Sequence, residues 1–223
     1  MSKVKTTRLD IAKLQQESKS LYCRIDSVYN QSAHQINHAD ETMRRVYQLD
    51  LTAQKGWGNE APKYLLQYVQ DNHLNIDIPE FTNIGYWFKP RVILLLSLIK
   101  QEISKISDQE IRDFIFVAFS ETIRFVSNRR NGEFKMFRMP ADKVDGFEPN
   151  VIKDFTTILN RNVEKMMAFE KACADAGTES SVSIFKNNAA TLEDVPNSSV
   201  DLVITSPPYG DSRTTVAYGE YSR

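Results

Sequence analysis

The residues most able to do chemistry lie near the end of the 223-residue chain, directly after a short apolar run. Val200 to Thr205 has the composition of a buried parallel strand, and Ser206, Pro207, Pro208 and Tyr209 follow it at once. In α/β sheets, ligands bind at the carboxyl ends of strands, which is where this tetrad would lie. A rigid turn, or a polyproline ligand for another protein, is the alternative. The apolar run before the tetrad favours a site over an exposed ligand.

The run and tetrad resemble motif IV of the DNA amino-methyltransferases, which methylate the exocyclic amine of cytosine (N4) or adenine (N6). An aryl amine is a poor nucleophile because its lone pair is delocalised into the ring. The resemblance implies that Ser206 Oγ and the Pro207 carbonyl accept hydrogen bonds from the amino group. Pro207 and Pro208 would fix the backbone, and Tyr209 would stack on a base flipped out of the duplex. These four are the predicted catalytic residues, and serine at the first position favours cytosine N4.

The resemblance extends more loosely upstream, to 86–88, 113–130 and 133–135, so that it covers most of the chain. Cytosine C5 methylation is not indicated, because that family uses a Pro-Cys nucleophile. Here Tyr22 precedes Cys23 and Ala172 precedes Cys173. The resemblance therefore points to methylation of an amino group.

The sequence departs from this family where S-adenosylmethionine should bind. The family uses a D-P-F-x-G-x-G loop after a strand, but only 8 residues here are Gly, about half the usual ~7%. The single G-x-G is 56–58, in a polar turn. Asn188 stands where the family has an acid in a Gly-Asp-Ala motif; it is the predicted cofactor contact, with a simple turn residue as the alternative. S-adenosylmethionine is thus the expected co-substrate, with its main loop lacking from this chain.

A basic cluster with interleaved phenylalanines is the predicted DNA contact. The net charge is only −1, so that any contact with nucleic acid must come from a local patch. Basic side chains neutralise phosphates; those of the cluster are Arg124, Arg129, Arg130, Lys135 and Arg138. A solvated helix end is the alternative. The aromatic run 86–88 is expected to pack in a core, with base stacking as its alternative.

Apolar spacing predicts that about 175 residues are mainly helical. Two modest helices are expected near 14–28 and 43–51, separated by a polar break at 30–37, and a short helix begins near Pro62. Pro90 starts a mostly buried helix to about 106, in which Glu102 is expected on the surface.

Further helices are predicted in the second half of the chain. A helix over 111–126 has Asp108 or Ser107 as its N-cap, and a charged loop occupies 140–149. The last helix, 150–176, ends at Gly177. Short strands are expected at 182–185 and 200–205.

The predicted fold class is mainly α with a partial α/β segment. Residues 1–180 form a helical region that would contact DNA as an insertion. Residues 181–223 form part of a Rossmann-like methyltransferase sheet, which is incomplete. A core truncated in this way would expose apolar side chains along 200–205.

Composition excludes several other classes. The longest strongly apolar run, Val92 to Ile99, is too short for a membrane helix, which needs about 20 residues. No secretory signal is visible. Two distant cysteines fit a reducing compartment, and the three histidines offer no H-E-x-x-H, so no metal site is indicated. A cytoplasmic protein is expected.

Together these features predict a DNA methyltransferase polypeptide of a restriction–modification system. It would act on double-stranded DNA and be inactive without a complementary chain that carries the cofactor loop. The alternative is an inactive remnant, or a non-enzymatic DNA-binding or interaction module derived from the same fold.

Overall fold

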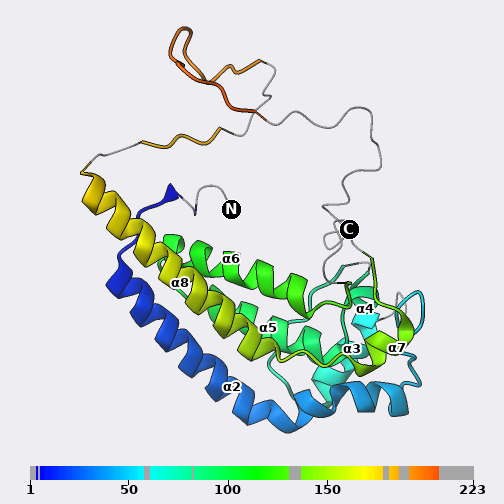
Figure 1. Ribbon diagram of the computed structural model, residues 1–223. Helices are drawn as coiled ribbons and strands as arrows, with labels where there is room; N and C mark the ends of the chain where they lie inside the picture. Colours follow the sequence, from blue (N-terminus) through cyan, green and yellow to red (C-terminus); the bar gives the residue numbers. More distant parts are fainter. Residues whose placement is uncertain are drawn as a thin grey trace.

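A computed structural model of the protein describes residues 4, 6–57, 61–81, 83–130, 137–177, 181–185 and 191–205. Its main feature is a bundle of long helices, α2 (Ile11–Val46), α5 (Pro90–Ser104), α6 (Gln109–Val126) and α8 (Val151–Ala176). Three shorter helices gather at one end of the bundle (Figure 1), namely α3 (Ala61–Asp71), α4 (Ile84–Trp87) and α7 (Ala141–Gly146).

Helix α5 is the centre of the bundle, and it packs against α2, α6 and α8. Its sequence is apolar around most of the helix, which is the pattern of a helix covered on all sides. Pro90 occupies its first turn, where the missing N–H of proline costs no hydrogen bond. The buried helix predicted from Pro90 is therefore confirmed.

The ends of α6 and α8 also follow their sequence signals. The Asp108 carboxylate accepts hydrogen bonds from the backbone N–H groups of Glu110 and Ile111, as an N-cap should. Helix α8 ends at Gly177, which has φ 61°, a left-handed conformation that glycine adopts without a steric penalty. Both predicted caps are confirmed.

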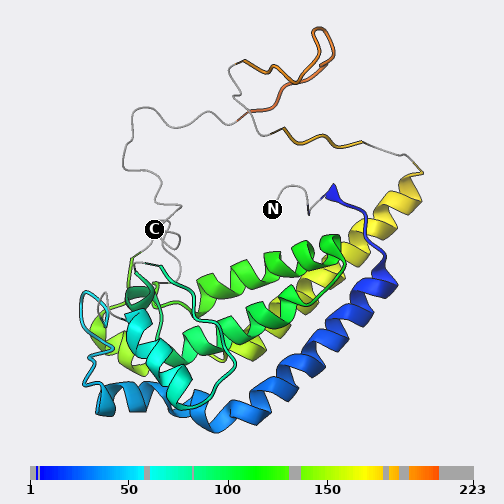
Figure 2. The ribbon, with the colours of Figure 1, turned by 180° about the vertical axis from the view of Figure 1, so that it is seen from behind.

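Helix α2 corrects the prediction of two helices, because its 36 residues run without interruption through the expected break at 30–37. The apolar stripe continues across the polar segment: Ile36, Ala39 and Met43 are fully buried. Tertiary packing of this stripe overrides the weak helix propensity of asparagine and serine. The helix bends along the edge of the bundle (Figures 1 and 2).

Two further expectations are wrong. The charged loop expected at 140–149 contains α7, which begins directly after Pro140. Glu102, expected on the surface, is 2% exposed in α5.

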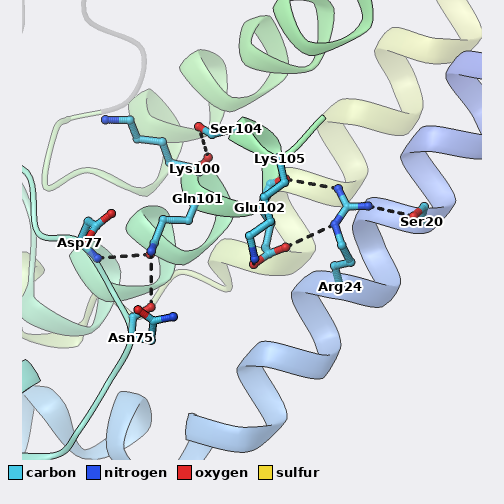
Figure 3. Close-up of polar contacts among 9 residues, drawn as sticks. All are labelled: Ser20, Arg24, Asn75, Asp77, Lys100, Gln101, Glu102, Ser104 and Lys105. Carbon is cyan, nitrogen blue, oxygen red and sulfur yellow. Dashed lines mark hydrogen bonds and ion pairs between the residues drawn. The ribbon is translucent and has the colours of Figure 1, made fainter. Parts of the chain in front are cut away.

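The Glu102 carboxylate joins two helices. It pairs with Arg24 of α2 at 3.3 Å and with Lys105 at 2.5 Å (Figure 3). Arg24 also donates to the Glu102 carbonyl at 3.3 Å. Because α2 covers this side of α5, the carboxylate is buried and needs these cationic partners.

The segments 181–185 and 191–205 run apart from the helices in both views (Figures 1 and 2). They contain no strand in the part of the chain that the structure describes. The apolar side chains of the second segment are exposed, as expected: Val200 is 55% exposed, Leu202 74%, Val203 75% and Ile204 88%. A strand requires a neighbour for its backbone, so the Rossmann-like sheet stays a prediction.

Candidate nucleic-acid interface

Arg138 belongs to the predicted basic cluster, but its guanidinium is directed into the protein. It is 9% exposed and donates to the carbonyls of Tyr86 and Ala53, both at 2.8 Å. It also donates to the carbonyls of Leu51 at 3.2 Å and Thr52 at 3.3 Å, and it lies 5.2 Å from the centre of the Tyr86 ring. Burial lowers the pKa of this guanidinium, which nevertheless stays charged in proteins. Arg138 therefore fastens the 51–53 turn to α4.

The backbone on either side of Arg138 pairs with the segment that follows α6. Arg129 and Arg138 form an antiparallel bridge. Arg130 N donates to the Phe137 carbonyl at 2.8 Å, and Met139 N donates to the Asn128 carbonyl at 2.7 Å. This register places Arg130 directly opposite Phe137.

The pairing separates the predicted arginines into two sets, because successive side chains of an extended segment point to opposite faces. Arg129 and Arg138 are buried, at 7% and 9% exposure. Arg130 is exposed, and Phe137 opposite it is 48% exposed. The structure thus gives Arg138 a structural task and presents Arg130 to solvent.

Helix α6 adds a second exposed pair at its C-terminus. Arg124 is exposed and Phe125 is 50% exposed, in the last turn before Ser127. Arginine at this position also complements the helix dipole, which is the alternative given by the sequence. Lys135 of the predicted cluster lies outside the residues described.

Sequence reasoning did not distinguish inward from outward arginines. Buried and exposed arginines are separated by the alternation of side chains between the two faces of the segments paired at Arg129 and Arg138. This alternation can be used only when it is known which segments pair. Arg129 Nε is buried and has no hydrogen-bond partner among the described residues.

The aromatic run 86–88 belongs mainly to the core. Trp87 is 2% exposed and Phe88 3%, and the Phe88 carbonyl accepts a 2.8 Å hydrogen bond from the Trp57 indole. Tyr86 is half-buried and meets Trp87 edge to face, with ring centroids 4.7 Å apart. Core packing rather than base stacking is confirmed for Trp87 and Phe88.

Gly56 and Trp57, the described part of the only G-x-G, are packing residues. Gly56 has φ 73°, and a Cβ there would lie 2.5 Å from the Gly85 carbonyl oxygen. Trp57 is 4% exposed. These two residues do not fit a loop that holds S-adenosylmethionine.

The predicted catalytic residues Ser206, Pro207, Pro208 and Tyr209, and the predicted cofactor contact Asn188, lie outside the described residues.

In the described ranges, no three His, Cys, Asp or Glu side chains lie together as metal ligands. None of the helices described is long and apolar enough to cross a membrane. His34 and His38 stack on each other along α2, with ring centroids 4.3 Å apart.

Comparison with known proteins finds a sequence similarity to a methyltransferase. Over 158 residues, which are 70% of this chain, the sequence is 40% identical to one such enzyme. That relative is the type II methyltransferase M.MvaI of Kocuria varians, and the chain spans 35% of its length. No family model matches the chain, and no solved structure matches it.

Proposed function

We propose that this chain is part of a site-specific DNA methyltransferase of a restriction–modification system. The reaction transfers a methyl group to an exocyclic amine of DNA, with cytosine N4 favoured over adenine N6. The observation that carries this proposal is the Ser-Pro-Pro-Tyr tetrad after an apolar run. The 40% identity to a methyltransferase supports it.

The tetrad, Ser206 to Tyr209, would make the exocyclic amine of the base, a poor nucleophile, reactive. Ser206 Oγ and the Pro207 carbonyl accept hydrogen bonds from the two amino protons, which returns electron density to the nitrogen. Tyr209 stacks on the flipped base and fixes its plane. Pro207 and Pro208 hold the accepting carbonyl in place, since proline fixes φ.

S-adenosylmethionine supplies the methyl group. The chain spans 35% of its relative, and Gly56 and Trp57 pack against α4 and the residues after it instead of forming a cofactor loop. We assign that loop to a complementary polypeptide, with Asn188 at the edge of the cofactor site. The chain alone is then inactive.

The helical region supplies the DNA contact. Of the predicted basic cluster, Arg124 and Arg130 are described and exposed, and we assign to them, with Lys135, the neutralisation of phosphates. Arg129 and Arg138, which are buried, support this surface from behind.

The test measures transfer of labelled methyl groups to duplex DNA. The purified chain is mixed with the product of a neighbouring gene that carries a D-P-F-x-G-x-G loop, and the DNA is digested to nucleosides. We expect N4-methylcytosine only in the mixture. Ser206→Ala should lower the rate about 100-fold, the usual effect of removing one stabilising hydrogen bond. Ser199→Ala, a nearby exposed serine whose hydroxyl contacts the Pro196 carbonyl, is the matched control.

Other outcomes reject parts of the proposal. N6-methyladenine as the product would overturn the cytosine preference. DNA binding without transfer in any mixture would favour the remnant or the non-enzymatic module. Binding of S-adenosylmethionine by the isolated chain would exclude both of those alternatives and would show that the cofactor loop is not required.

A further inference from the structure

The outward face of the Arg129–Arg138 bridge presents a cation and an aromatic ring together. Arg130 and Phe137 are directly opposite each other in the register fixed by the Arg130 N–Phe137 O bond of 2.8 Å. Both side chains are exposed, and Phe137 is 48% exposed. A phosphate site requires only the cation, so the ring needs a separate explanation.

We infer that the Arg130–Phe137 pair binds DNA where base stacking is interrupted. The Phe137 ring stacks on the face of an unstacked base, and the Arg130 guanidinium neutralises the adjoining phosphate. This inference rests on the proposed function, because an enzyme that flips a base creates such an interruption.

The rigidity of the surface supports this role. Arg138, next to Phe137, is held by hydrogen bonds to four carbonyls at 2.8–3.3 Å. On the segment paired with it, Asn128 N donates to the Trp87 carbonyl at 2.7 Å. An exposed ring on a fixed backbone loses little conformational entropy on binding.

The C-terminal end of α6 also presents an exposed arginine together with an exposed phenyl ring. Arg124 is exposed beside Phe125, which is 50% exposed. The Ser127 hydroxyl donates to the Arg124 carbonyl at 2.9 Å, which ties this turn to the start of the paired segment. The stretch 124–130 therefore carries two exposed arginines, Arg124 and Arg130, and one exposed ring, Phe125, and a second ring, Phe137, lies opposite its end. Interleaved basic and aromatic side chains are typical of surfaces that bind unstacked nucleic acid.

The test compares three fluorescent DNAs with the full chain, by anisotropy at fixed salt. They are a fully paired duplex, the same duplex with one unpaired nucleotide, and the single strand. We expect the duplex with the unpaired nucleotide to bind about 5-fold more tightly than the paired one, since stacking one base contributes ~1 kcal/mol or more. Phe137→Ala and Phe137→Leu should abolish this preference, and Phe137→Trp should retain it.

The controls separate this inference from the proposed function. Arg130→Gln should weaken binding to all three DNAs by a similar factor. Phe185→Ala removes another exposed phenyl, 51% exposed, and should change nothing. If Phe137→Ala binds all three DNAs like the wild type while Arg130→Gln weakens them, stacking is wrong and the phosphate contact stands. If the wild type binds none of the DNAs, both are wrong.

Discussion

The guanidinium of Arg138 holds together parts of the chain that are distant in sequence. It donates to the carbonyls of Leu51, Ala53 and Tyr86, among others. Arg138→Ala removes all of these bonds and leaves buried or partly buried carbonyls without this donor, so we expect a loss of about 3 kcal/mol in the free energy of unfolding. Arg138→Lys should also destabilise the protein, because one ammonium cannot span four carbonyls.

Urea unfolding followed by circular dichroism measures this loss. Arg124→Ala is the matched control, because Arg124 is exposed and its removal should cost less than about 0.5 kcal/mol. Equal stability of the two variants would refute the structural role of Arg138.

Tyr22 gives a prediction for alkaline pH. Its hydroxyl donates to Asn160 Oδ1 at 2.7 Å, which links α2 to α8. Burial raises the pKa of Tyr22 from 10.0 to about 12, so the folded state keeps its proton where the unfolded state loses it. The stability that this group contributes is present below pH 10 and is lost as the pH rises to about 12.

Tyr22→Phe tests this directly. The wild-type free energy of unfolding should fall more steeply between about pH 10 and 12 than that of the variant. Denaturant titrations at several pH values measure the difference. Parallel curves for the two proteins would contradict the prediction.

At the same scale, Glu102 and Arg138 show why some roles could not be predicted. Both were expected to lie on the surface, and both are at least nine-tenths buried. Glu102 is buried because α2 covers it, and Arg138 is buried because the 51–53 turn and α4 enclose it. Such partners lie 52 or more positions away along the chain, and local periodicity carries no information about them.

At the scale of elements, α5, α6 and α8 were predictable because each combines a clear apolar period with a signal at an end. Pro90, Asp108 and Gly177 are these signals. The break in α2 was wrong because polar residues in one turn were given more weight than the stripe through Ile36 and Met43. Helix α7 was missed because six residues are too few to show a period.

Continuity of α2 predicts the effect of a substitution within the expected break. Asn30 is exposed inside the helix, and alanine has the higher helix propensity. Asn30→Ala should therefore raise the free energy of unfolding by about 0.5 kcal/mol. Asn197→Ala, in an exposed non-helical segment, should have no effect. Destabilisation by Asn30→Ala, measured by urea unfolding, would instead favour the broken helix.

At the scale of the whole molecule, the chain divides between a packed bundle and the segments that lead to the motif. The helical nature of the region before residue 180 was predictable from its composition and from the helical spacing of its apolar residues. The sheet was not testable in the same way, because a strand is defined by its neighbour, and the apolar run at 200–205 has no partner strand in the described residues. The predicted catalytic tetrad therefore still depends on sequence resemblance and on relatives.

This division predicts the result of shortening the chain after residue 180. The described residues of 181–205 are nearly all exposed, so the core of the bundle does not depend on them. A protein of residues 1–180 should keep the same thermal midpoint within about 3 °C, since a loss of 1 kcal/mol would shift it by about 2–4 °C or more. It should also bind less of a hydrophobic dye, because Leu202, Val203 and Ile204, each at least 74% exposed, are removed. Circular dichroism melting and dye fluorescence measure the two effects. A large fall in the midpoint would show that the C-terminal segment packs on the helices, and would contradict the two-part organisation.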